Sequence, residues 1–256
     1  MKETHSKKGT FLKENLLGVG ITVASEREVL EYIVTGLGEA AEKYYVVTPN
    51  PELLVIANND PEYKKVLNCA KLASPDGVGV ILAGKILGKG FKGKITGVDL
   101  VEKLCGEVVE QPITVGFLGG GPGVAIMARD CLQKKYPGLK IALAESGNPD
   151  DKTVDLIQEK TLKTKGVDIL FVAFGSPKQE FWIYKNLEKL PVKVAIGVGG
   201  AFDFISGNVK RAPGWVQKIG LEWFFRLINQ PWRFKRQLAL ITFIKLVLKE
   251  KLAGSK

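Results

Sequence analysis

The sequence predicts an α/β protein with a Rossmann-like parallel sheet flanked by helices, followed by a basic helical appendage at the C-terminus. Strand–loop–helix units repeat along the chain, and their strands are almost continuously apolar, as in a sheet covered on both faces. The chain of 256 residues, 45% of them hydrophobic, is long enough for one large core. We therefore divide it into a flexible N-terminus (1–15), an α/β core (16–208) and the C-terminal appendage (209–256).

Six short apolar runs, each bounded by turn residues, are predicted as strands. They are 18–23, 44–48, 113–118, 140–144, 168–174 and 193–198. Helices are predicted over 25–43, 52–70, 124–136 and 151–164. Ser25 with Glu28 forms a capping-box pair, and Asn50 followed by Pro51 is a typical helix start. This alternation of strands and helices is the basis for the predicted fold.

Four of the predicted strands end in loops, and ligands of open α/β sheets bind beyond the carboxyl ends of the strands. These loops are 48–52, 119–123, 175–180 and 199–203. Gly119, Gly120 and Gly121 bring backbone N–H groups to a helix start, which suits a phosphate or a sugar hydroxyl. The alternative is a tight turn that requires glycine. The loop is neither a GxGxxG motif, because Val124 holds the third glycine position, nor a Walker A loop.

Polar side chains in these loops have a structural and a functional interpretation each. Thr48 and Asn50 could cap a helix or face a ligand. Ser176 could open a capping box over the next residues, or Gln179 could point its amide at a substrate. Asp203 follows a double glycine and could contact a base or ribose hydroxyl, or cap a helix. Spacing alone leaves each pair of alternatives open.

Asp76 lies in a Pro-Asp-Gly turn ahead of an apolar helical segment. An aspartate in such a turn commonly caps a helix, but a buried one can serve as a general base. The chain has one histidine, His5, in its polar first ten residues, which excludes a histidine base in the core. Carboxylates are therefore the natural candidates for proton transfer.

No metal site and no disulfide framework is expected. Cys69, Cys105 and Cys131 are far apart and show no CxxC spacing, which fits a reducing compartment. The sequence also contains no Asp-x-Asp triplet of the kind that holds a metal in many nucleotide-sugar transferases. Arginines pair well with phosphate and could meet the charge of a diphosphate instead. The arginines of the appendage are Arg211, Arg226, Arg233 and Arg236.

The appendage carries most of the positive charge of the protein. It holds eleven Lys or Arg and two Glu, out of a net charge of +10 for the whole chain. A helix is predicted from Pro213 to about Ile228, and a second one follows Pro231. The apolar run 237–248 is shorter than the ~20 residues of a membrane span and contains Lys245. The pattern fits a membrane surface and a helix packed on the core equally well, and we see no signal peptide.

Seven ordered motifs together resemble the TagA/WecG/CpsF glycosyltransferases, glycosyltransferase family 26. They are TPNPELL at 48–54, SPDGVGV at 74–80, ITGVDL at 95–100, FLGGGPG at 117–123, GSPKQEFW at 175–182, GVGGAFDFISG at 197–207 and KRAPGWVQKIGLEWFFRL at 210–227. The similarity covers about residues 16–236. Because the motifs occur in order over nearly the whole chain, they are far more specific together than singly.

The resemblance implies an inverting glycosyltransferase of wall teichoic acid linkage-unit assembly. The implied donor is UDP-N-acetylmannosamine, and the implied acceptor is undecaprenyl-diphosphate-linked N-acetylglucosamine, joined by a β-1,4 bond. It implies no metal and no cofactor, and a peripheral position on the cytoplasmic face of the cell membrane. Another UDP-sugar, such as UDP-N-acetylmannosaminuronic acid or UDP-glucose, is the alternative within the family. Apart from the resemblance, an exposed apolar face on the appendage favours self-association, so a monomer–dimer equilibrium is expected. No nucleic acid is expected as a partner.

The motifs also carry over individual roles. Asp76 matches the proposed base, which would deprotonate the 4-hydroxyl of the acceptor. The other catalytic positions implied are Thr48, Asn50, Gln179, Arg226, Arg233 and Arg236. The positions expected to bind the donor are Gly119, Gly120, Gly121, Gly175, Gly200, Phe202, Asp203, Lys94 and Arg211. Lys94 stands where many members have arginine, and Gly214 stands where a basic residue is expected.

Two other classes of protein compete with this interpretation. A nicotinamide-dependent oxidoreductase would share the sheet and the glycine loop, but the third glycine is missing and Glu145 is a marginal ribose ligand. A nucleic-acid-binding protein would share the high pI of about 9.4. The charge, however, is confined to an appendage rich in Phe, Trp and Leu, without a nucleic-acid motif.

Overall fold

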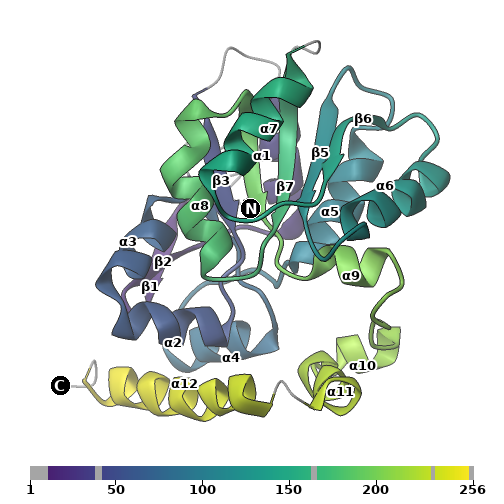
Figure 1. Ribbon diagram of the computed structural model, residues 1–256. Coiled ribbons are helices and arrows are strands. Elements are labelled where there is room, and N and C mark those ends of the chain that lie inside the picture. The colour runs from purple at the N-terminus through teal and green to yellow at the C-terminus, as the bar shows by residue number, and fades with distance from the viewer. Residues whose placement is uncertain (1–10, 38–41, 163–165, 232–233, 254–256) are drawn as a thin grey trace, which may run out of the picture.

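The computed structural model describes residues 11–37, 42–162, 166–231 and 234–253, and its centre is a six-stranded sheet (Figure 1). The strands lie in the order β4-β3-β8-β7-β5-β6, and each neighbouring pair is parallel. They are β3 (Tyr44–Val47), β4 (Leu72–Ala73), β5 (Thr114–Gly119), β6 (Lys140–Glu145), β7 (Val167–Ala173) and β8 (Val192–Gly197). The predicted Rossmann-like α/β class is confirmed.

The first of the predicted strands belongs to a separate hairpin. Residues 18–23 correspond to β2 (Val19–Thr22), which pairs antiparallel with β1 (Lys13–Leu16) outside the parallel sheet. Leu17 (φ 54°) and Gly18 (φ 84°) form the tight turn between the two strands. The prediction missed β1 because its sequence, KENL, is mostly polar and has no apolar run.

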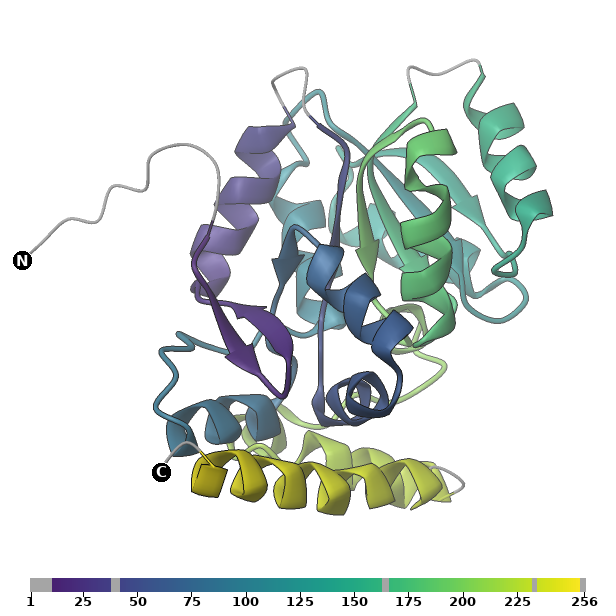
Figure 2. The same cartoon turned by 90° about the vertical axis from the view of Figure 1, so that its left-hand side faces the viewer.

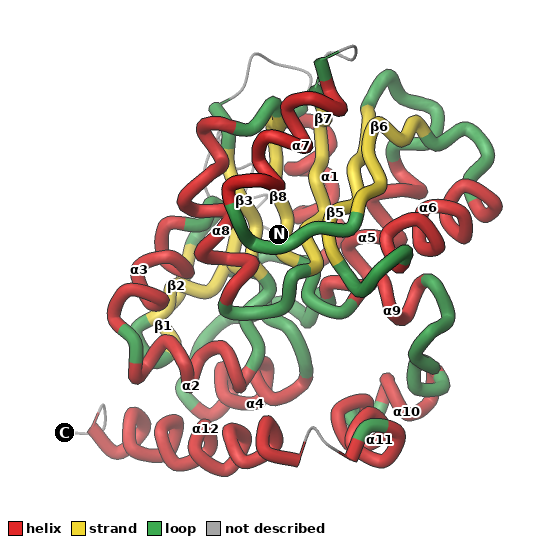
Figure 3. Tube along the Cα trace, viewed as in Figure 1, coloured by secondary structure: helices red, strands yellow, loops and turns green. Residues whose placement is uncertain are grey.

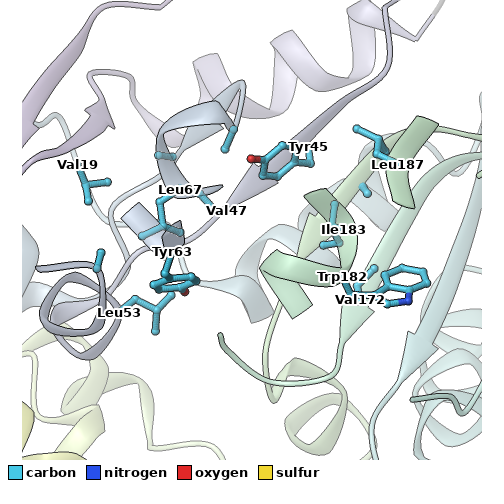
Figure 4. Packing of buried hydrophobic residues seen from close by; sticks show 14 of the residues in the cluster. Val19, Tyr45, Val47, Leu53, Tyr63, Leu67, Val172, Trp182, Ile183 and Leu187 are labelled. Carbon is cyan, nitrogen blue, oxygen red and sulfur yellow. The ribbon is translucent and has the colours of Figure 1, made fainter. Parts of the chain in front are cut away.

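Helices cover both faces of the sheet (Figure 2). One face packs against α1 (Glu26–Gly36), α5 (Gly97–Glu107), α6 (Val124–Lys135) and α9 (Ala201–Ile205). The other packs against α2 (Pro51–Asn59), α3 (Pro61–Cys69), α7 (Asp151–Thr161) and α8 (Lys178–Asn186), with the short 3-10 helix η1 (Leu187–Lys189) after α8. Figure 4 shows this second core, in which Tyr63, Leu67 and Trp182 pack among strand residues such as Val172. Two apolar layers therefore enclose the strands, which explains their continuous hydrophobicity.

Local capping signals set where several helices begin. Ser25 and Glu28 form the predicted capping box at α1, although that helix ends at Gly36 rather than near residue 43. Asn50 Oδ1 accepts the backbone N–H of Leu53 at 3.0 Å and caps α2. The predicted helix over 52–70 is two helices, because Asp60 ends α2 and caps α3.

The described residues of the appendage form three helices, where two are predicted for residues 213 onwards. They are α10 (Gly214–Lys218), α11 (Glu222–Asn229) and α12 (Phe234–Ala253). The predicted helix from Pro213 to Ile228 is interrupted at Gly220, whose φ of 79° is a left-handed conformation. Another helix, α4 (Val78–Ile86), lies between the sheet and α12 (Figure 1).

The long helix α12 packs across α2 and α4 and has two different faces (Figure 2). Phe243 and Val247 are buried in the core against the α2 side, and the Glu250 carboxylate accepts the backbone N–H of Leu17 at 3.0 Å. On the opposite side, Ile241 and Leu252 are exposed. The helix therefore packs on its own core, as one of the two interpretations expects, and still presents apolar side chains to solvent.

Candidate active site

A large cleft lies where the loops after the parallel strands meet the appendage. Figure 3 shows these loops at the end of the sheet that faces α10, α11 and α12. Its volume is about 1010 Å³, at the upper end of the range for small-molecule sites. All four loops predicted to form the pocket contribute to its wall. The predicted site residues that line it are Thr48, Asn50, Asp76, Lys94, Gly120, Gly121, Gly175, Gln179, Gly200, Asp203 and Arg226.

Asp76 lies at the start of the connection into α4 and is held by backbone hydrogen bonds on both sides. Its N–H donates to the carbonyl of Pro49 at 2.9 Å, and the carbonyl of Pro75 accepts the N–H of Ile95 at 2.9 Å. The turn is thereby fixed between the loop after β3 and the start of α5. Asp76 does not cap α4, which has no side-chain cap.

Burial raises the pKa of Asp76 to about 7, from an ordinary value of 3.8. The nearby carboxylates of Glu222 and Asp99 add to this increase, while Lys94 and Arg226 oppose it. A carboxyl that titrates near neutral pH can accept a proton with more driving force than an ordinary aspartate. The local environment thus suits Asp76 to general-base chemistry.

Gln179 is buried, and its side-chain amide is fully used inside the protein. Its Oε1 accepts the backbone N–H groups of Gly175 (3.2 Å) and Gly199 (3.1 Å). Its Nε2 donates to Ser176 Oγ (3.2 Å) and Glu180 Oε1 (2.7 Å). An amide has two acceptor and two donor positions, so the side chain holds two loops together and has none left for a substrate.

The capping-box interpretation of Ser176 does not hold in the structure. Helix α8 has no side-chain cap at its first turn, and the hydroxyl of Ser176 instead donates to Glu180 Oε1 at 2.7 Å. Glu180 is buried, which raises its pKa, and Tyr63 donates to its other oxygen at 3.2 Å. This buried network holds Ser176 and Gln179, which line the cleft. No sequence pattern distinguishes Glu180 from a surface acid.

Thr48 and Asn50 satisfy the structural interpretation and also line the cleft. Asn50 caps α2 through Oδ1, as described above. The Thr48 hydroxyl lies 3.5 Å from the carbonyl of Gly197, at the end of the neighbouring strand. Both side chains therefore help to fix the loop after β3 at the position where it borders the cleft.

The glycine loop after β5 needs glycine for its backbone shape and also borders the cleft. Gly119, Gly120 and Gly123 have φ values of 103°, 76° and 76°. Gly120 and Gly121 line the cleft beside the start of α6, whereas Gly119 ends β5 and does not. Gly120 and Gly121 thus line the cleft, as predicted. Gly119 does not, and its positive φ accounts for a glycine at that position.

Phe202 and Asp203 are neighbours in α9 but lie in different environments. Asp203 lines the cleft, and burial raises its pKa although the positive charge of Arg226 opposes the increase. Phe202 is fully buried and packs edge-on against Phe117. The prediction of Phe202 as a donor contact is therefore corrected: successive residues of a helix point in different directions, and this one belongs to the core.

Among the side chains of the appendage that the structure describes, Arg226 and Glu222 bring charge to the cleft. The guanidinium of Arg226 lies 4.7 Å from the ring centre of Phe204, a cation–π arrangement. Arg211 does not line the cleft; it donates to Asp99 at 2.7 Å and contacts Glu222 at 3.4 Å. Its predicted place at the donor is corrected, because these carboxylates hold it outside the cavity.

Sequence reasoning missed Glu222 and Trp223 as cleft residues, although both lie in a motif that it quoted. Lys94, which lines the cleft, donates to the carbonyl of Gln217 at 3.1 Å and so ties the core to α10. Arg233 lies outside the described residues. Arg236 lies on α12, and its side chain is also outside what the structure describes.

A family model for the "Glycosyl transferase WecG/TagA/CpsF family" matches residues 14–256. The chain belongs to this family. Two WecG/TagA/CpsF relatives carry the name N-acetylglucosaminyldiphosphoundecaprenol N-acetyl-beta-D-mannosaminyltransferase. That of Bacillus spizizenii (strain ATCC 23059 / NRRL B-14472 / W23) is 36% identical over 214 residues, covering 83% of this chain and 81% of the relative. That of Bacillus subtilis (strain 168) is 34% identical over 225 residues, covering 85% and 87%.

Membership of the WecG/TagA/CpsF family confirms the resemblance drawn from the seven motifs and makes the protein a glycosyltransferase. The cleft provides what group transfer between sugars requires: a carboxylate with a raised pKa, cations and glycine loops. Within the described ranges, none of the helices combines the length and apolar character needed to cross a bilayer.

Proposed function

We propose that the protein transfers N-acetylmannosamine from UDP-N-acetylmannosamine to undecaprenyl-diphosphate-linked N-acetylglucosamine, as the names of its two relatives suggest. The product would carry a β-1,4 bond formed with inversion, as in wall teichoic acid linkage-unit assembly. Another UDP-sugar, UDP-N-acetylmannosaminuronic acid or UDP-glucose, is the second candidate donor. The observation that carries the proposal is the position of Asp76 in the cleft with a pKa of about 7.

The proposed step is a direct displacement. Asp76 takes the proton of the acceptor 4-hydroxyl while the oxygen forms a bond to the anomeric carbon of the donor. The bond between that carbon and the diphosphate oxygen breaks, and its electron pair leaves with UDP. Arg226 and Lys94, which both line the cleft, stabilise the charge on the leaving diphosphate. Arg233 and Arg236 are proposed to join them when the substrates are bound.

The UDP-sugar is the donor substrate, and we propose that the reaction needs neither a cofactor nor a metal ion. Support comes from the residue types, because Lys94 and Arg226 bring positive charge into the cleft and the sequence has no Asp-x-Asp triplet. Gly120 and Gly121, beside the start of α6, are suited to a phosphate or a sugar hydroxyl.

The proposed place of action is the cytoplasmic face of the cell membrane, with the protein bound peripherally through its appendage. The positive charge of the appendage suits anionic lipid. Trp215 on α10, Ile219 just after that helix and Ile228 on α11 are exposed. A homodimer stays a prediction. Trp215→Ser with Ile219→Ser should reduce recovery with anionic vesicles; unchanged recovery would contradict the membrane proposal.

The test of the proposed function is UDP release in the presence of EDTA. The protein is incubated with UDP-N-acetylmannosamine and a lipid-diphosphate N-acetylglucosamine, each alone and together. Release that requires both substrates supports the proposal. Release with a different UDP-sugar keeps the reaction and changes the donor, while release restored only by a divalent cation contradicts the metal-free proposal. No release with any UDP-sugar overturns the reaction itself.

A further inference from the structure

The cleft has an apolar arm in addition to its polar end. One wall of the arm is a face of α4, formed by Val78, Leu82, Ala83 and Ile86. The other wall is a face of α12, formed by Leu240, Phe243, Ile244, Val247 and Leu248. The spacing of both sets places them on one side of each helix. Two helix faces thus extend the cavity that holds Asp76 with an almost purely aliphatic lining.

Several of these aliphatic side chains are only partly covered. The exposed fractions are 51% for Leu82, 45% for Ile86, 51% for Ile244 and 51% for Leu248. None of them can serve the proton transfer or the diphosphate, because they carry no polar group. An apolar wall that stays open to solvent and is continuous with a catalytic cleft is suited to an apolar part of the substrate.

We propose that this arm binds the first isoprene units of the lipid chain of the acceptor. The inference rests on the proposed function, in which one substrate carries a sugar, a diphosphate and a long hydrocarbon chain in that order. With the acceptor sugar at Asp76 and Lys94 and Arg226 occupied by the diphosphate of the donor, the lipid chain of the acceptor must leave the cleft in another direction. The arm between α4 and α12 continues the cleft, and its apolar lining suits a hydrocarbon chain.

The test uses two soluble acceptors with the same N-acetylglucosamine-diphosphate head, one ending in a methyl group and the other in a farnesyl chain. Assays run without membranes or detergent. Leu248→Asn and Leu82→Asn place an amide in the arm from different helices, so a folding defect in one does not decide the result. Ile241→Asn is the matched control, because Ile241 also lies on α12, is 55% exposed and lies outside the cleft lining.

The wild type should bind the farnesyl acceptor with the lower KM. Leu248→Asn and Leu82→Asn should raise that KM by about tenfold and leave the KM of the methyl acceptor unchanged. Ile241→Asn should change neither. Equal KM values for the two acceptors in the wild type, or the same effect in the control, would overturn the proposal, the latter by indicating a general apolar surface.

A separate readout distinguishes failure of this inference from failure of the proposed function. A fluorescent farnesyl diphosphate is titrated into each variant without any donor. Weaker binding by Leu248→Asn and Leu82→Asn, but not by Ile241→Asn, supports the arm even if no UDP-sugar is turned over. Equal binding by all three overturns the arm even if the transferase activity is confirmed.

Discussion

The α/β core and the C-terminal appendage differ in how far their apolar side chains are buried. In β7 and β8 nearly every residue is buried, because helices cover both sides of these strands. In α11 none is fully buried, although Trp223, Phe224 and Ile228 make the helix strongly amphipathic. Folding of this chain therefore satisfies the apolar pattern of the core and leaves that of the appendage available to a lipid or a substrate.

Helix α12 shows both kinds of surface, because one of its sides is buried and the other is exposed. Phe243 and Val247 face the core and Phe234 faces solvent, although the residues come from one continuous helix. A helix that is apolar on both sides has no single amphipathic direction, so its sequence pattern supports two roles at once. We expect the core to supply the base and most of the stability, and the appendage to have smaller effects on both.

The largest effect is expected from Asp76→Ala, which removes the proposed base from the core side of the cleft. Turnover should fall by about 10²- to 10⁴-fold, because general-base catalysis contributes that much. Binding of UDP should remain, measured by titration calorimetry, since the diphosphate contacts are separate. Near-normal turnover would show that the base lies elsewhere.

Phe243→Ala should destabilise the protein by about 3 kcal/mol, because it leaves a cavity in the core. Phe234→Ala, an equal truncation on the exposed face of the same helix, should change the free energy of unfolding by less than about 0.5 kcal/mol. Urea unfolding followed by circular dichroism measures both. Similar losses in the two variants would contradict the division of α12 into a core face and a free face.

The raised pKa of Asp76 should make the folded protein less stable as pH rises towards and above neutrality. Its carboxyl keeps a proton up to about pH 7 in the folded protein but only to its ordinary 3.8 when unfolded. The folded state therefore binds more protons in this window, and wild-type stability falls as pH rises through it. Asp76→Asn should be more stable than wild type by about 1–2 kcal/mol near pH 8, allowing for partial solvation.

Near pH 4 this difference should vanish, since both folded forms are then uncharged at position 76. Thermal unfolding at the two pH values measures the effect. A stabilisation independent of pH would mean that Asn gains a new contact, and the raised pKa would lose its support. The turnover of the wild type should likewise fall below about pH 7, as Asp76 becomes protonated.

The smallest effect is expected from Glu222→Gln in the appendage. The carboxylate of Glu222 raises the pKa of Asp76, so its neutralisation should lower that pKa. The acid side of the pH–rate profile should move to lower pH by less than about one unit. Glu62→Gln, an exposed change on α3, is the control. An unchanged profile for Glu222→Gln would show that the appendage does not tune the base.

The sequence predicted the sheet and the meeting of its loops because both depend on local pattern. Apolar runs predict buried strands, and the carboxyl ends of parallel strands share one edge. It could not separate Phe202 from Asp203, because the direction of neighbouring side chains depends on how α9 docks. It also placed Arg211 at the donor, since its partner Asp99 lies 112 positions away and only the folded chain brings them together.

Because every hydrogen-bonding position of the Gln179 amide has a partner within the protein, few side chains can replace it. Even glutamate, which has the same shape, would lose both donors and set a second carboxylate against the buried Glu180. A survey of all single substitutions would therefore rank position 179 among the most sensitive, beside Asp76. That sensitivity would follow from the spacing of two loops, because all four hydrogen-bonding positions of the amide have partners within the protein.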